Sequence, residues 1–191
     1  MKFMRVLVAC AACLGAGTPV FAEKIPLAAI ESYIESITTA RGTFEQINPD
    51  KSRVTGQLIL KRPWRARFDY DAPVNSSVIA AAGSLTIVDG KSDSKQVYPL
   101  NKTPLVHLLR PNVDLSTTTD VVAHTYNGRH TIVTMVDRNN LEAGQIHLVF
   151  EGPSPKLVQW IIRTGGEQTY VVLKSLDLGG PVSDSVFQEG R

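Results

Sequence analysis

The amino-acid sequence predicts a mainly β protein with a few helices, in which antiparallel strands form an up-and-down sheet or barrel. Apolar and polar residues alternate from Trp64 to Tyr70, as in a strand with one buried and one solvated face. Asn127-Gly128 separates two strand-like segments and is a strong signal for a β-hairpin. Turn-forming residues recur at spacings of roughly 8–15 residues, which is typical of such sheets.

The alternation of apolar and polar residues, with a period of two, locates the individual strands. They are predicted at residues 43–48, 54–62, 64–70, 77–81, 85–88, 121–126, 129–136, 145–150, 156–163 and 168–176. In the second of these strands, Leu58, Leu60 and Arg62 share one face. In the third, Trp64 is predicted on the apolar face and Arg65 on the solvated face.

Two segments break the period of two and predict helices. In residues 26–39, apolar side chains recur at steps of three and four, which indicates an amphipathic helix. These side chains are Leu27, Ile30, Tyr33, Ile34 and Ile37. Residues 104–110 predict a short, leucine-rich helix, because Thr103 can cap it, Pro104 suits a first helical position and Pro111 stops the run.

The first 22 residues are predicted to be a secretory signal peptide that is cleaved after Ala22. Lys2 and Arg5 supply the positive start, and the apolar run 6–17 follows them. A signal anchor is the alternative, for which that run is short. The remaining residues, 23–191, are predicted to form a single domain, because a chain of this size without linkers or repeats makes one core.

Both cysteines, Cys10 and Cys13, lie in the predicted signal peptide, which excludes disulfides and thiolate metal sites from the cleaved chain. Residues 7–10 resemble a lipobox, but the stretch between Arg5 and Cys10 is shorter than the apolar region of about 7–15 residues that export signals contain. Cleavage would leave 18 basic and 18 acidic residues. A neutral chain gives no electrostatic case for binding nucleic acid.

The sequence contains no motif of an enzyme, a phosphate site or a dinucleotide site, so it predicts no catalytic residues, no metal and no cofactor. Asp69 and Asp71 can form a carboxylate pair, although the arginines beside them favour a solvated, charged face. His124 and His130 flank the hairpin turn and can face each other, but exposed strand histidines are the favoured interpretation. A hydrolase with an unrecognised serine is a further alternative that no spacing supports.

With no catalytic, metal or cofactor site predicted, the remaining functional feature of the sequence is its apolar surface. A sheet with an apolar inner face and two leucine-rich helices can form an apolar cavity for a ligand, with the helices as its covers. It fits equally a plain core in which the helices plug the barrel, since side chains often fill small barrels.

Several motifs, in order along the chain, resemble the LolA family of outer-membrane lipoprotein carriers. Residues 42–46 (Gly-Thr-Phe-Glu-Gln) followed by 56–63 (Gly-Gln-Leu-Ile-Leu-Lys-Arg-Pro) are similar to the opening of that family. Residues 68–73 (Phe-Asp-Tyr-Asp-Ala-Pro) resemble its aromatic strand. Its middle helix region and its closing strands are matched by residues 98–109, 157–160, 169–173 and Phe187.

The resemblance implies an unclosed antiparallel β-barrel covered by an α-helical lid, which is built from the N-terminal helix and the 104–110 helix. It implies a monomer in the periplasm of a Gram-negative bacterium, not an enzyme. The expected partners are acylated lipoproteins, an inner-membrane ABC transporter of the LolCDE type and, where one is present, an outer-membrane acceptor of the LolB type. A LolA-like binding module for another lipid or polyprenyl ligand is the alternative.

The resemblance also implies roles for individual residues. Arg62 matches the arginine that latches the lid, and an arginine at a strand end can direct its donors to carbonyls at the C-terminus of a lid helix. The predicted acyl-chain cavity consists of Leu58, Leu60, Phe68, Tyr70, Leu105, Leu108 and Leu109. The predicted lid helix contributes Leu27, Ile30 and Ile34. Ala66 stands where some relatives carry an aromatic residue, which predicts a wider cavity or a weaker grip.

Overall fold

The computed structural model describes residues 23–118 and 120–188, so the predicted signal peptide with Cys10 and Cys13 lies outside the described residues. The strands are β1 (Thr39–Ile47), β2 (Arg53–Lys61), β3 (Arg65–Tyr70), β4 (Ser77–Ala81), β5 (Ser84–Val88), β6 (Lys95–Pro99), β7 (Val121–Tyr126), β8 (His130–Val136), β9 (Gln145–Glu151), β10 (Lys156–Thr164) and β11 (Glu167–Leu178). The α-helices are α1 (Leu27–Ser36) and α2 (Val106–Leu109), and 3-10 turns occur at η1 (Leu100–Lys102), η2 (Leu141–Ala143) and η3 (Asp184–Phe187).

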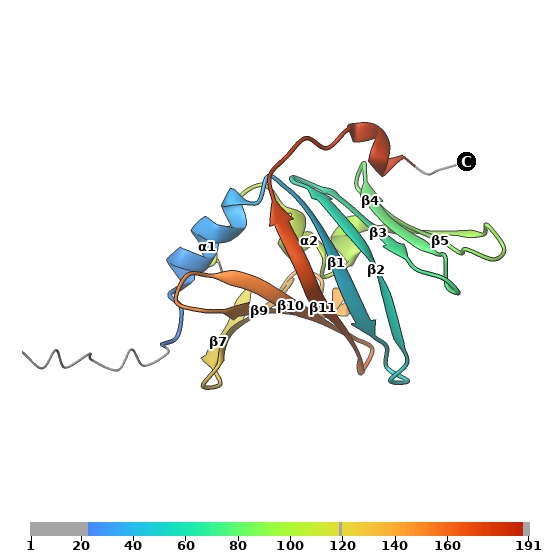
Figure 1. Ribbon diagram of the computed structural model, residues 1–191. Helices are drawn as coiled ribbons and strands as arrows, with labels where there is room; N and C mark the ends of the chain where they lie inside the picture. Colours follow the sequence, from blue (N-terminus) through green and yellow to red (C-terminus); the bar gives the residue numbers. More distant parts are fainter. Residues whose placement is uncertain (1–22, 119, 189–191) are drawn as a thin grey trace, which may run out of the picture.

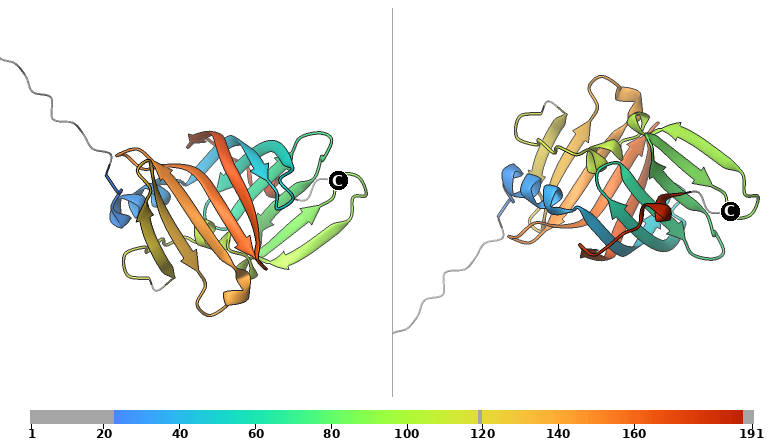
Figure 2. Two further views of the ribbon diagram at one scale, coloured as in Figure 1. Left: turned by 90° about the horizontal axis from the view of Figure 1, so that it is seen from below. Right: turned by 90° about the horizontal axis from the view of Figure 1, so that it is seen from above.

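Within the described residues, all eleven strands belong to one antiparallel sheet in the order β6-β5-β4-β3-β2-β1-β11-β10-β9-β8-β7. Strands β6 and β7 follow each other in the chain but lie at opposite edges, so the sheet is unclosed. The sheet curves, and the two α-helices lie on its concave side (Figures 1 and 2). The predicted fold class, mainly β with an unclosed antiparallel sheet, is therefore confirmed.

Strand β3 shows how alternation produces the two faces. Ala66 and Phe68 are buried against the concave side, whereas Arg67 and Asp69 form an ion pair on the outer side, 2.8 Å from Nε to Oδ2. The prediction that Trp64 continues the apolar face is wrong. Trp64 lies in the β2–β3 turn with a left-handed φ of 68° and is 38% exposed. The tight turn rotates this residue out of the pleat, so the alternation of the strand does not extend to it.

Strand β6 was not predicted, and both helices are shorter than predicted. All five residues of β6 are exposed at an edge of the sheet, so they carry no alternation between apolar and polar positions. Helix α1 ends at Ser36, because the Ile37 amide turns back to the Ile34 carbonyl at 3.1 Å. Only four residues of the predicted 104–110 helix are α-helical.

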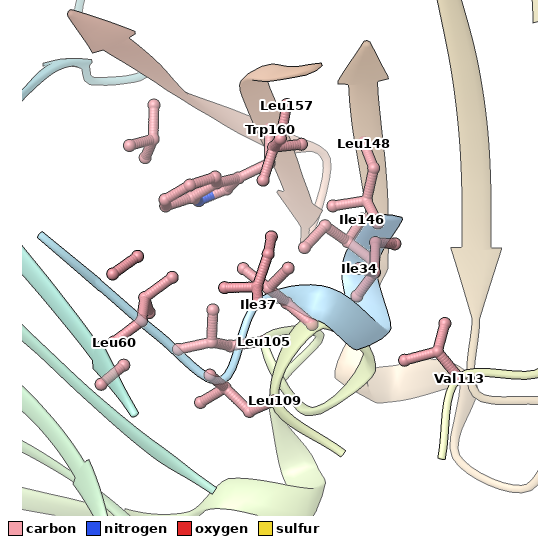
Figure 3. Packing of buried hydrophobic residues seen from close by; sticks show 14 of the residues in the cluster. Ile34, Ile37, Leu60, Leu105, Leu109, Val113, Ile146, Leu148, Leu157 and Trp160 are labelled. Carbon is pink, nitrogen blue, oxygen red and sulfur yellow. The ribbon is translucent and has the colours of Figure 1, made fainter. Parts of the chain in front are cut away.

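The core lies between the helices and the concave face. Helix α1 buries Ile30 and Ile34 completely, and α2 buries Leu108 and Leu109. These side chains belong to the same buried cluster as Trp160 and the leucines and isoleucines of the sheet (Figure 3). Burial of each such side chain contributes about 1.5–3 kcal/mol. No helix in the described ranges is long and apolar enough to cross a membrane.

The outer face is covered locally by the end of the chain. Val182 and Phe187 are buried against Ile79 of β4, next to η3. The resemblance had grouped Phe187 with the closing strands, but this residue lies in a 3-10 turn. Figure 1 shows this last segment crossing above the sheet towards β4.

Candidate functional site

A cavity of about 210 Å³ lies on the concave side, between the sheet and the segment that leads into α2. Its lining is almost entirely apolar and comes from opposite halves of the sheet. The lining residues are Gln46, Phe68, Tyr70, Val78, Leu85, Thr103, Pro104, Leu105, Trp160, Ile162 and Val171. The antiparallel register brings these residues together, because β3 to β5 and β10 to β11 flank the central pair β1 and β2.

Aromatic rings in edge-to-face contact form one wall of the cavity. The ring centroid of Phe44 lies 5.7 Å from that of Phe68 and 5.3 Å from that of Tyr70. Phe68 lies 6.0 Å from Trp160. Gly56 makes room for this packing, since a Cβ atom there would stand 2.8 Å from the Phe44 ring and 2.3 Å from the Asp69 carbonyl oxygen. Such pairs contribute about 0.5–1.5 kcal/mol beyond area burial, so they stabilise this arrangement of the wall.

The one hydroxyl on the aromatic wall is hydrogen-bonded. Tyr70 donates to Gln46 Oε1 at 2.7 Å, and Gln46 in turn donates to Asn48 Oδ1 at 2.7 Å. Burial raises the pKa of Tyr70 to about 12. The phenol therefore stays neutral at physiological pH, and the wall presents no charge to a bound apolar chain.

Tyr70 is expected to make stability fall between pH 10 and pH 12. The folded protein holds a proton that the unfolded chain releases near pH 10, so this contribution is full below pH 10 and is lost as the pH rises through 12. The difference corresponds to about 2–3 kcal/mol. Urea unfolding across this range should show a smaller fall for Tyr70→Phe than for the parent chain. Parallel curves for the two proteins would contradict the assignment.

Arg62 follows β2 directly and connects the two α-helices. Its Nη1 donates to the Ile34 carbonyl in the last turn of α1, and its Nη2 donates to the Arg110 carbonyl at 2.6 Å, just after α2. The Pro111 carbonyl lies 3.4 Å from the same Nη2. Carbonyls at helix C-termini carry partial negative charge, so the Ile34 carbonyl favours a guanidinium although it also accepts from the Ile37 amide. Burial lowers the pKa of Arg62 from its ordinary value.

A polar cluster that the sequence did not reveal lies next to this bridge. Arg110 Nη1 is 3.1 Å from Asp120 Oδ2, and His107 Nδ1 is 3.9 Å from the same oxygen. Burial lowers the pKa of His107, with Arg110 adding to the effect, which favours the neutral ring. The ion pair holds Arg110, whose carbonyl accepts from Arg62. Because Asp120 lies just before β7, ten residues after Arg110, no local pattern could have predicted the contact.

Comparison of the sequence with models of known protein families identifies the family to which this chain belongs. Residues 35–189 match the family described as "Outer membrane lipoprotein carrier protein LolA". The chain belongs to the LolA family. The match covers β1 to β11 and η3, and thus the whole concave face described above.

Solved structures similar to this LolA-family protein have distant sequences. A conserved protein from Thermus thermophilus, described as uncharacterized, is 6% identical with a TM-score of 0.49, over 86% of this chain and 91% of that one. A LolA superfamily protein from Nitrosomonas europaea is 10% identical with a TM-score of 0.45, over 86% and 98%. A chain of the Pseudomonas aeruginosa MucA/MucB complex is 14% identical with a TM-score of 0.43, over 85% and 60%. Comparison with curated proteins finds no match.

The residues predicted for the acyl-chain cavity and for the lid helix divide into two groups in this LolA-family structure. Phe68, Tyr70 and Leu105 line the cavity. The remaining ones lie in or against the buried core, where the helices meet the sheet; they are Leu27, Ile30, Ile34, Leu58, Leu60, Leu108 and Leu109. The sequence missed Trp160 and Val171 as lining residues, although alternation in the last strands places both on the inner face. Ala66 is fully buried and does not line the cavity.

The polar alternatives considered from the sequence are engaged in structural contacts. His124 pairs in register with Val133, not with His130, and its Nε2 lies 2.9 Å from the Ile25 carbonyl oxygen. The idea that the two histidines face each other is therefore wrong, because His130 is the first residue of β8 and lies beyond the last register pair, Tyr126 with Thr131. Asp71 accepts from Thr55 at 2.6 Å. In the part of the chain that the structure describes, no group of three or more potential metal ligands occurs.

A second, more open groove of about 660 Å³ lies at the rim, beside the turn that contains Arg62. Trp64 and Val106 are among its lining residues, together with the β4–β5 turn and η1. The groove therefore adjoins both the Arg62 turn and α2.

Proposed function

We propose that this LolA-family protein is a periplasmic carrier that takes lipoproteins from an inner-membrane transporter of the LolCDE type, shields their acyl chains on its concave face and delivers them to the outer membrane. The observation that carries the proposal is the Arg62 bridge from α1 to the end of α2, above an apolar, uncharged cavity. Such a bridge is a latch for a lid. We assign no catalytic step to the protein.

The size of the cavity supports a lid that opens. At about 210 Å³ the cavity is smaller than the 300–1,000 Å³ that is typical of ligand pockets. Side chains of α1 and α2 pack in the main buried cluster on the concave side of the sheet. An acyl chain therefore enters only when the helices move outward, and Leu58 and Leu60 would then join Phe68 and Tyr70 in the wall.

For a single acyl chain, burial of the chain and closure of the lid have similar energies, which suits a carrier that uses no ATP of its own. Burial of an acyl chain of about 15 methylenes contributes on the order of 12 kcal/mol, at about 0.8 kcal/mol for each methylene. Displacement of Ile30, Ile34, Leu108 and Leu109 from the sheet costs about 1.5–3 kcal/mol each, or roughly 6–12 kcal/mol together. For one acyl chain the two terms are of the same size, so displacement of the lid offsets much of the burial energy and such a chain is not held irreversibly.

The remaining parts of the proposal concern processing and partners. We propose that residues 1–22 direct export and are removed, and that residues 23–191 act as one monomeric domain. A LolB-type acceptor in the outer membrane, where one is present, would receive the lipoprotein. Ile25, close to the proposed cleavage point, is held in the domain by hydrogen bonds to Thr131 and His124.

A release assay tests the proposal. Spheroplasts that hold a newly made triacylated lipoprotein are incubated with the exported protein. We expect the lipoprotein to appear in the soluble fraction as a one-to-one complex, because its acyl chains exchange from the membrane into the concave face. A lipoprotein variant without its lipidated cysteine serves as the control and should form no complex.

Retention of the lipoprotein on the membrane, in the presence of folded carrier, would contradict the proposal. Mass spectrometry of lipids extracted from the purified protein would then identify another lipid or a polyprenyl chain as the ligand.

A further inference from the structure

The outer face of the β2–β3 hairpin carries two cations where like charges are unfavourable. Lys61 ends β2, Arg65 begins β3, and the two residues are directly opposite in the antiparallel register. Like charges in directly opposed positions destabilise a strand pair. Asp184 lies between them, with its Oδ1 2.5 Å from Lys61 Nζ and 2.5 Å from Arg65 Nη1. One carboxylate from the end of the chain therefore compensates the repulsion at this end of the hairpin.

Asp184 belongs to residues 182–188, a segment that crosses the outer face of the sheet and that we call the strap. Val182 and Phe187 anchor it, since they are 6% and 5% exposed and pack with Ile79. Lys61 Nζ also donates to the Val182 carbonyl at 2.8 Å. Figure 1 shows the strap passing from the end of β11 towards β4. The strap is thus attached to β2, β3 and β4 by both apolar and charged contacts.

The same end of the hairpin carries the latch on its inner face. The backbone N–H of Arg62 donates to the Thr38 carbonyl at 2.8 Å, and that of Trp64 donates to the Leu109 carbonyl at 2.9 Å. Lys61 and Arg65 flank this turn on both sides. A contact that holds Lys61 and Arg65 together therefore also constrains the turn from which the Arg62 side chain extends.

We infer that Asp184 is a positioning residue for the Arg62 latch, through which the strap holds the lid closed from the outer face of the sheet. The inference rests on the proposed function of Arg62. Asp184 joins the two ends of the turn, and the turn directs the guanidinium to the carbonyls of Ile34 and Arg110. Since Asp184 is exposed, its ion pairs are screened by solvent, and the effect is a graded shift of the lid equilibrium.

Amide hydrogen exchange followed by mass spectrometry of the exported protein tests the inference. In Asp184→Asn, we expect exchange in α1, residues 27–36, to become about 3- to 10-fold faster. Exchange in β9 and β10 should stay unchanged, because lid opening exposes the helix whereas a general loss of stability affects both regions. Asp184→Glu is expected to restore slow exchange in α1.

Glu45 offers a matched control. It bridges two cations in the same way, with Oε1 2.6 Å from Arg53 and Oε2 2.6 Å from Lys174. Its cross-strand partner Thr55, however, lies roughly 23 Å along the strand from Arg62. Glu45→Gln is expected to leave exchange in α1 unchanged. An increase equal to that of Asp184→Asn would overturn the inference, because it would show a general effect of lost surface charge.

Combination with Arg62→Leu separates positioning from a direct effect on stability. Without the latch, Asp184→Asn is expected to cause no further increase in α1 exchange. Unchanged exchange in the single variant, or an equal increase with and without Arg62, would overturn the inference. The measurement needs no ligand, so the release assay tests the carrier function independently.

Discussion

Replacing Arg62 with leucine is expected to make amide exchange in α1 about 10- to 100-fold faster. The guanidinium donates to the Ile34 carbonyl in α1 and, at 2.6 Å, to the Arg110 carbonyl after α2. Hydrogen bonds that involve a charged group contribute about 1.5–3 kcal/mol each, and loss of one such contribution shifts the opening equilibrium by the stated factor. Leucine places an apolar side chain at the rim but cannot donate a hydrogen bond to a carbonyl at either helix.

The same variant is expected to retain lipoprotein longer than the parent chain. The closed and the loaded states compete for the concave face, so weakening the closed state favours the loaded one. In the release assay, complexes should accumulate and transfer slowly to outer membranes. Arg62→Lys is the control, because lysine keeps the positive charge but lacks the planar guanidinium that donates to two carbonyls. Its retention of lipoprotein should lie between that of the parent chain and that of Arg62→Leu. Normal exchange and normal transfer by Arg62→Leu would remove this residue from the mechanism.

Replacing Trp160 with alanine is expected to lower the free energy of unfolding by about 3–5 kcal/mol. Trp160 is 1% exposed, belongs to the main buried cluster and contacts Phe68 edge to face. Removal of the indole leaves a cavity that the surrounding side chains close only partly, which adds to the lost burial. Urea unfolding followed by far-ultraviolet circular dichroism measures the change.

Trp64→Ala provides the comparison within the same chain. Trp64 is 38% exposed in the β2–β3 turn and makes its hydrogen bond to Leu109 through the backbone, which alanine retains. We expect a loss of at most about 1 kcal/mol. Equal losses for the two variants would mean that Trp160 does not support the wall of the cavity. The Trp160→Ala protein, if folded, is also expected to accept bulkier acyl chains, because its cavity is enlarged.

Local patterns along the chain predicted the strands well, because alternation depends only on which side chains point to the same face. The hairpin at Asn127-Gly128 and strands β7 and β8 lie where the pattern indicates. Edge strand β6 escaped prediction for the same reason, since an exposed strand needs no apolar face. Trp64 was assigned to the wrong environment because a turn interrupts the pleat at that residue.

The candidate site was predicted only in part. Phe68, Tyr70 and Leu105 come from segments that the family resemblance highlighted, and they do line the cavity. Trp160 and Val171 complete the cavity from strands that come much later in the chain, so their role depends on the order of strands in the sheet. That order is a property of the whole fold, and no local pattern encodes it.

The amino-acid sequence by itself determined the mainly β class, the approximate position of most strands, the amphipathic face of α1 and, through its colinear motifs, membership of the LolA family. Only the tertiary structure decided what Arg62 contacts, which side chains fill the concave face and how Asp184 meets Lys61 and Arg65. The physical reason is the separation along the chain over which each interaction acts. Alternation and capping act between neighbours in the chain, whereas these contacts join segments separated by 28 to 123 residues and exist only after the sheet has curved and its ends have been covered.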